Sequence, residues 1–136
     1  MPMYNKEVLE EILANNERLP ENSVILFGVE KPNSIATFLL PSAANIHPCF
    51  VAFGSSGITL LQLTRQYEID ETKIFYYPKE KIKNVSFTKS FLYYIATIDI
   101  ALKNQSFIFR VGKNPSKGSF YTSQEKELKT FVQRYM

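Results

Sequence analysis

The chain contains one histidine and one cysteine, and their spacing makes them the first candidates for chemistry. His47 and Cys49 are two residues apart, so they share a face if this stretch is an extended strand. A working thiolate also needs an orienting group and an oxyanion site, and Pro48 between the pair is typical of a turn. A zinc site takes three or four ligands, more than this pair supplies. We therefore expect a buried structural cysteine, an exposed loop histidine, no metal and no catalytic pair.

The acidic residues and a glycine-flanked turn give no stronger signal for catalysis. Glu68, Asp70 and Glu71 cluster in a polar stretch, where solvated carboxylates are the simplest interpretation. The turn Gly54–Gly57 resembles a phosphate-binding loop only in its glycines. It lacks the Lys and Ser/Thr ending of such loops, and a predicted strand, not a helix, follows it. The sequence thus predicts a hairpin turn here, no cofactor, and a protein that is not an enzyme.

A run of lysines is the one electrostatic feature that points to a ligand. Glu80 is the only acid within the run, and Tyr77 and Phe87 lie in or beside it. Such a segment can bind an anionic lipid head group, an anionic membrane surface or nucleic acid. The alternative is a solvated turn and strand edge, whose lysines keep the sheet from pairing with neighbours. The candidate ligand-binding residues are Lys79, Lys81, Lys83 and Lys89.

Length and composition bound the class of protein. The 136 residues, 45% of them hydrophobic, fit one domain with an ordinary core. The formal net charge of +3 is too small to require a nucleic-acid partner, and we expect none. A single cysteine and an N-terminus without a basic, apolar leader favour a cytoplasmic protein. No apolar run reaches the roughly 18 to 20 residues that cross a bilayer.

Residues 1–20 are expected to form an N-terminal amphipathic helix ahead of the main domain. Val8, Leu9, Ile12 and Leu13 recur at helical spacing. Asn5 suits the N-cap position, and a carboxylate in the first turn agrees with the helix dipole. The apolar stripe has to dock on a surface. We expect that surface to be the domain's own sheet, with a partner protein as the alternative.

Residues 21–136 are expected to form a mainly β domain, organised around an antiparallel meander from Thr72 to Val111. Within the meander, Ala96, Ile98 and Ile100 lie on one face of a strand, which predicts a half-buried sheet. The run Ile58–Leu61 is apolar on both sides, as in a central strand covered twice. The expected strands span 23–31, 35–40, 49–54, 58–65, 73–78, 83–89, 92–102 and 106–111, with a polar connection at 65–71. Thr122 and Glu125 have the spacing of a capping box and predict a C-terminal helix over 122–135.

The order of these elements resembles the bacterial pleckstrin-homology-like domains, relatives of the PH and GRAM superfold. The resemblance covers roughly 21–136. It is carried by the hairpin CFVAFGSSGITLLQL, the segment FYYPKEKIKNVSF, the strand KNQSFIFRV and the capped terminal helix. It implies a bent antiparallel barrel or sandwich of about seven strands, a C-terminal helix that plugs one open end, and no catalytic residues. In this chain the first hairpin turn supplies only Lys31, where phosphoinositide-binding relatives use several basic residues.

The sequence therefore predicts a non-catalytic PH-like binding or scaffolding module. Its leading mode of action is contact with a protein partner or with copies of itself, because the expected fold is complete and brings no active site together. The alternative is peripheral binding of anionic lipid head groups through the lysine segment 79–89.

Overall fold

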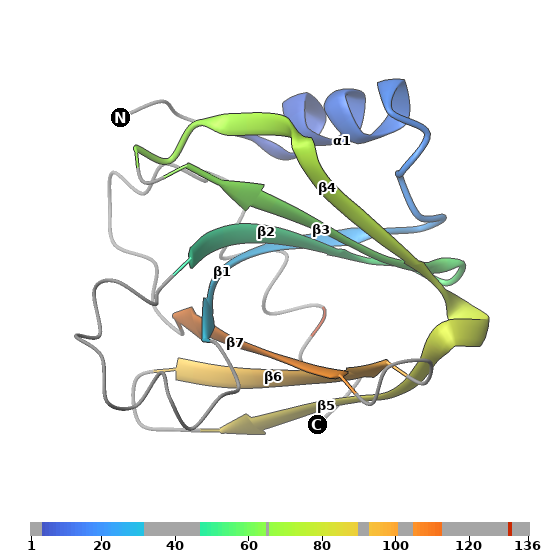
Figure 1. Ribbon diagram of the computed structural model, residues 1–136, viewed down its shortest axis with the longest axis vertical. Coiled ribbons are helices and arrows are strands. Elements are labelled where there is room, and N and C mark those ends of the chain that lie inside the picture. Colours follow the sequence, from blue (N-terminus) through green and yellow to red (C-terminus); the bar gives the residue numbers. More distant parts are fainter. Residues whose placement is uncertain are drawn as a thin grey trace.

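The fold is described from a computed structural model, over residues 4–31, 47–64, 66–89, 93–100, 105–112 and 131. The described residues are mainly β, with the helix α1 and an antiparallel sheet that curls into a half-barrel (Figure 1). The elements, in chain order, are α1 (Lys6–Asn15), β1 (Val24–Lys31), β2 (His47–Phe53), β3 (Gly57–Leu63), β4 (Ile69–Pro78), the 3-10 turn η2 (Lys79–Lys81), β5 (Ile82–Lys89), β6 (Tyr93–Ile100) and β7 (Gln105–Gly112).

The strand order of the sheet is β4-β3-β2-β1-β7-β6-β5, and the sheet curls at β1 (Figure 1). Strand β1 pairs with β2 over nearly its whole length, but with β7 only through Val29–Lys31. It therefore bends from one half of the sheet into the other. The two edge strands, β4 and β5, are consecutive in the chain and are joined by η2, so the sheet edges meet at that corner (Figure 1).

The described core residues form two hydrophobic clusters. The larger cluster fills the inside of the half-barrel. Alternation along β6 buries Ala96, Ile98 and Ile100, as the sequence pattern predicts. They meet side chains from the other half of the sheet, including Leu26, Val51, Phe53, Ile58 and Leu60. Phe131 is the one described residue of the expected C-terminal helix. Its ring is 2% exposed and lies 4.6 Å from that of Phe53, centroid to centroid.

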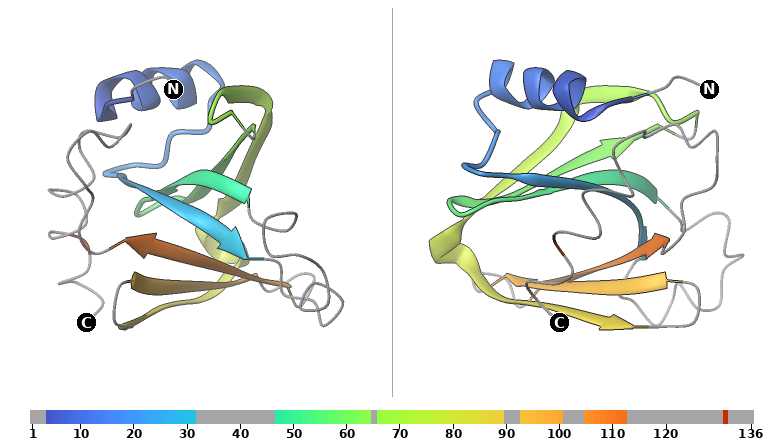
Figure 2. Two further views of the ribbon diagram at one scale, coloured as in Figure 1. Left: turned by 90° about the vertical axis from the view of Figure 1, so that its left-hand side faces the viewer. Right: turned by 180° about the vertical axis from the view of Figure 1, so that it is seen from behind.

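Helix α1 covers the outer face of the β1–β4 half. The Asn5 side chain accepts a hydrogen bond from the Val8 amide at 2.9 Å and caps the helix, as expected. Leu9 and Leu13 are fully buried against Ile25, Phe50, Ala52, Leu61 and Leu63. The views in Figure 2 place α1 and the β5–β7 half on opposite sides of the β1–β4 half. The predicted docking of the helix on the domain's own sheet is confirmed.

Strand β3 is covered on both faces, as the run Ile58–Leu61 predicts. Ile58 and Leu60 belong to the interior cluster, whereas Leu61 and Leu63 pack under α1. Thr59 is the one buried polar residue among the described core, and its hydroxyl donates to the Arg18 carbonyl. This bond ties the segment after α1 to the sheet.

Two expectations about loops differ from the structure. The polar connection predicted over 65–71 ends early, because β4 already begins at Ile69 and makes a wide bulge between Ile69 and Ile74. The backbone of His47 opens β2 and is not in a loop. The strand predicted at 35–40 and the helix predicted at 122–135 lie outside the described residues, apart from Phe131.

Candidate functional site

The predicted lysines divide into a group of three and one distant member. Lys79 and Lys81 lie in η2 and Lys83 follows in β5; all three side chains are exposed. No ion pair joins any of them to another described residue. Lys89 is at the far end of β5, about 20 Å along the strand from Lys83 at roughly 3.3 Å per residue. The structure thus gathers Lys79, Lys81 and Lys83, hereafter the lysine corner, and leaves Lys89 away from it.

A β-bulge turns Lys83 outward. Ile82 pairs with Ile100 and Asn84 with Asp99, so Lys83 is an extra residue without a counterpart on β6. The sequence pattern places Lys83 on the same face as Val85 and Phe87. With the bulge, Ile82 and Val85 both pack against the interior cluster, and Lys83 is exposed. Strict alternation therefore fails at this point of β5, because it does not allow for the extra residue.

The turn between β2 and β3 is held to the lysine corner and to the segment after α1. Its Ser56 carbonyl accepts from the Lys79 amide at 3.0 Å and from the Tyr76 hydroxyl at 3.1 Å. On the other side, the Ser55 amide donates to the Glu21 carbonyl and the Glu21 amide donates to Ser56 Oγ, both at 2.9 Å. The turn is therefore fixed from two directions. The Gly54 amide donates to the Gly57 carbonyl. This bond agrees with a hairpin turn and not with a phosphate-binding loop.

The two glycines of this turn are required by close approach. A Cβ atom on Gly54 would lie 2.4 Å from the Pro20 Cβ and 2.6 Å from the Glu21 carbonyl oxygen. One on Gly57 would lie 2.5 Å from the Tyr77 carbonyl oxygen. All three distances are too short for any side chain, so the neighbouring backbone can pass this close only because the residues are glycine.

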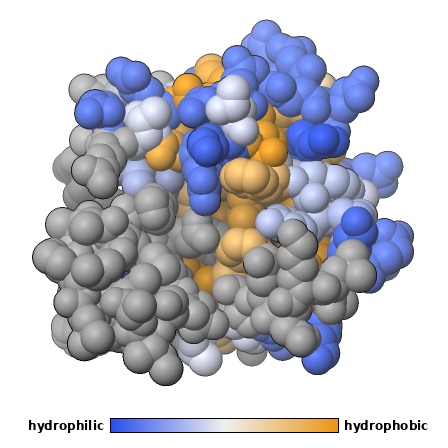
Figure 3. All heavy atoms as spheres, viewed as in Figure 1, coloured by the Kyte–Doolittle hydropathy of each residue, from blue (hydrophilic) through white to orange (hydrophobic). Residues whose placement is uncertain are grey.

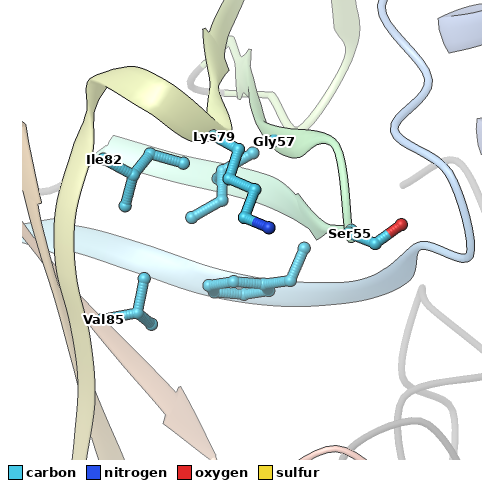
Figure 4. Close-up of a pocket in the computed structure, with 8 residues that line it drawn as sticks. Ser55, Gly57, Lys79, Ile82 and Val85 are labelled. Atoms are coloured by element: carbon cyan, nitrogen blue, oxygen red, sulfur yellow. The ribbon is translucent and has the colours of Figure 1, made fainter.

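A pocket of about 300 Å³ opens between this turn, η2 and β5. Its apolar walls come from both halves of the sheet: Phe53 and Ile58 from the first, Ile82 and Val85 from the second. Gly54, Ser55 and Gly57 supply the rim. Figure 4 shows Lys79 extending across the pocket, while the hydroxyl of Ser55 points away from it. Among the described residues that line the pocket, Lys79 is the only charged one.

Of the residues that first suggested chemistry, the structure describes the surroundings of Cys49. Cys49 is fully buried in the interior cluster, as expected, and its thiol lies 3.6 Å from the Gly28 carbonyl oxygen as a weak donor. Within the described part of the chain, no group of three His, Cys, Asp or Glu residues is placed to hold a metal ion.

Among the described residues, two titratable groups have a shifted pKa, and both shifts have structural causes. The hydroxyl and the amide of Thr72 donate to Asp70, which lowers the pKa of this carboxyl group. Burial raises the pKa of Tyr4, whose hydroxyl donates to the Tyr67 carbonyl at 2.8 Å. Neither residue lines the pocket.

The lysines can be recognised in the sequence, but the pocket beside them cannot. The pocket depends on Ile82 and Val85 facing the same way, which only the bulge allows. One signal was available: apolar residues three apart within a strand, separated by Lys83 and Asn84, break the two-residue period and mark an inserted residue.

No described helix is long and apolar enough to cross a membrane. Comparison of the chain with protein-family models, curated proteins and solved structures found no match.

Proposed function

We propose that this chain is a non-catalytic, cytoplasmic binding module of PH-like architecture, and that it binds anionic groups at the lysine corner. The strand arrangement supports the PH-like part: β1 to β4 follow each other in one half, β5 to β7 in the other, and β1 belongs to both. The binding part is carried by one observation. Three exposed lysines, with Glu80 as the only acid among them, extend from a corner whose backbone is fixed by the neighbouring turn.

The strength expected from these charges sets the kind of binding. A lysine near an anionic surface contributes about 1 kcal/mol, so the lysine corner contributes about 3 kcal/mol against a membrane rich in acidic lipid. That is weaker than the marginal binding that a single myristoyl chain gives, so we expect weak, reversible, peripheral attachment and no permanent anchoring. It also falls steeply with salt, because exposed charges are screened beyond about 10 Å at 0.1 M ionic strength.

Contact with proteins by strand addition is less favoured by the geometry, although the sequence alone ranks protein contacts first. The described edge β4 is interrupted by the wide bulge between Ile69 and Ile74 and ends at Pro78, which has no amide hydrogen. The described edge β5 carries its own bulge and exposed lysine at Lys83. Bulges and edge lysines are the devices that keep sheets from pairing with other chains.

Sedimentation with vesicles tests the anion-binding proposal. The protein is mixed with vesicles of neutral lipid, with and without a large fraction of phosphatidylserine, at low and at physiological salt. We expect binding only to the acidic vesicles. Replacing Lys81 and Lys83 by Gln is expected to weaken it about 25-fold, at roughly 5-fold for each lysine.

The matched control replaces Lys6 and Lys73 by Gln. Both are charged residues outside the corner, on α1 and β4, and the control has the same net charge as the test variant. If the two double variants bind equally, net charge explains the attachment and the lysine corner is not a site.

A second candidate function is contact with a protein through Phe75 on β4. This ring is 40% exposed, one of two large hydrophobic side chains exposed among the described residues. On the face shown in Figure 3, an apolar strip crosses the centre of the molecule between hydrophilic regions. A solution mass above that of one copy, falling when Phe75 is replaced by Asp, would support this candidate.

A further inference from the structure

The pocket beside Lys79 has the composition of a site for a small amphiphile. Its volume of about 300 Å³ is at the small end of the roughly 300–1,000 Å³ that ligand pockets occupy. Four apolar side chains, Phe53, Ile58, Ile82 and Val85, form the walls, and a single ammonium group reaches over them. Apolar walls with one well-placed polar group are the usual construction of a small-molecule site.

The positive charge of Lys79 at the pocket favours a negatively charged ligand. No carboxylate is among the described residues that line it, and no described residue forms an ion pair with Lys79. The Lys79 amide is fixed by the Ser56 carbonyl, so the stem of this lysine starts from a defined position at the pocket rim. A ligand with an anionic group can therefore pair with the ammonium while its apolar part lies below.

The walls are held in place before any ligand arrives. Phe53 and Ile58 flank the turn that is hydrogen-bonded on both sides, and they are only 5% and 4% exposed. Ile82 and Val85 pack against the interior cluster on either side of the bulge. A preformed pocket avoids the ordering cost that otherwise weakens the binding of small ligands.

We propose that this pocket binds a single-chain amphiphile with one anionic group, of the class of medium-chain carboxylates. The carboxylate pairs with Lys79, and the hydrocarbon chain lies between the walls from β2, β3 and β5. Such binding rests on the proposed anion-binding role of the corner, but through Lys79 and the walls and not through Lys81 or Lys83. The same combination of an anionic group and a hydrocarbon chain is offered by a free carboxylate and by an anionic lipid, through its head group and acyl chain.

Methyl NMR on the full chain, labelled at Ile and Val, tests whether the pocket binds an anionic amphiphile. Sodium octanoate is the probe. We expect a dissociation constant on the order of 1 mM, as for other ligands of this size, and shifts concentrated at Ile58, Ile82 and Val85. Octan-1-ol, which has the same chain without the charge, is expected to bind about 5-fold more weakly. Across shorter carboxylates, affinity should rise about 4-fold per methylene until the pocket is full.

Three variants locate the site. Lys79→Met is expected to weaken octanoate about 5-fold and leave octanol unchanged, whereas Lys81→Met leaves both unchanged, because Lys81 does not line the pocket. Val85→Phe is expected to fill the pocket and abolish the shifts, with its methyl spectrum showing whether it is folded. Octanol binding as tightly as octanoate, an unaltered response in Lys79→Met, or shifts confined to the α1 side of the sheet would each overturn the assignment.

Vesicles distinguish the two sources of the ligand and the two proposals. If the acyl chain of a lipid is the source, Val85→Phe also weakens binding to acidic vesicles; if a free carboxylate is, vesicle binding is unchanged. The Lys81 and Lys83 double variant loses vesicle binding and keeps octanoate binding. Unchanged vesicle binding in this double variant therefore counts against the lysine corner as a membrane site, and failure of the wild-type chain to bind octanoate counts against the pocket.

Discussion

Gly54 is the residue on which the geometry of the candidate site most depends. Its missing side chain lets the β2–β3 turn lie against Pro20 and Glu21. In Gly54→Ala the added methyl group meets the Pro20 Cβ at 2.4 Å and a backbone carbonyl at 2.6 Å, so the turn or the segment after α1 has to move. We expect the free energy of unfolding to fall by about 1–3 kcal/mol, as for other overpacked sites, in urea denaturation.

Ser55→Ala is the control for that measurement. It removes one hydrogen bond, from Ser55 Oγ to the Glu21 carbonyl at 3.3 Å, at an exposed position. Its expected cost is below about 1 kcal/mol. If Gly54→Ala costs no more than Ser55→Ala, the turn does not approach the Pro20–Glu21 segment as closely as described.

Asp70 gives a prediction about pH. The donors from Thr72 hold the folded pKa of Asp70 below its ordinary value, so the folded state binds a proton at this residue less readily than the unfolded chain does. The associated stability is therefore present above the unfolded pKa, about 3.9, and is lost as pH falls through the folded pKa. An NMR titration of the Asp70 carboxyl carbon should give a midpoint below that ordinary value, and Thr72→Val should move it upward. A midpoint unaltered by Thr72→Val would contradict the assigned cause.

At the scale of elements, α1 is a part of the folded unit because it closes the second hydrophobic cluster. Leu9 is 0% exposed and Leu13 is 1% exposed. We expect Leu9→Ala and Leu13→Ala each to lower the free energy of unfolding by about 2–5 kcal/mol, as for buried leucines elsewhere. Val8→Ala, whose side chain is 41% exposed on the same helix, should cost less than about 1 kcal/mol. Equal costs at Val8 and Leu9 would mean that the helix docks on a different face.

The elements also show which features of the fold can be predicted from the sequence of each segment alone. Helix α1, its Asn5 cap and the two covered faces of β3 follow from periods that each segment contains in itself. The bulges do not, because an extra residue is defined only by the strand opposite: Lys83 is extra relative to Asp99 and Ile100, and 70–73 relative to Gln62. The lysines of the candidate site could be predicted from the sequence, because they are close together along the chain. The pocket could not be, since it needs Phe53, Lys79 and Val85 to meet across the curl of the sheet.

At the scale of the whole molecule, the curl leaves two edges of the described sheet, β4 and β5, and both are unsuited to pairing. A bulge and a terminal proline interrupt β4 within Ile69–Pro78, and a bulge with the exposed charge of Lys83 interrupts β5. The one apolar feature exposed on these edges is Phe75. A single ring is far smaller than the roughly 800 Å² that each partner buries in a stable complex.

We therefore expect a solution mass of one copy, 15.7 kDa, in light scattering at micromolar concentration. The wild-type mass should not change with dilution, and Phe75→Asp should leave it unaltered because no interface is lost. Val8→Asp, at the other exposed hydrophobic residue, is the matched control on α1. A mass of two copies that Phe75→Asp reduces and Val8→Asp does not would place a self-association surface on β4, and protein contact would then precede anion binding as the function of this fold.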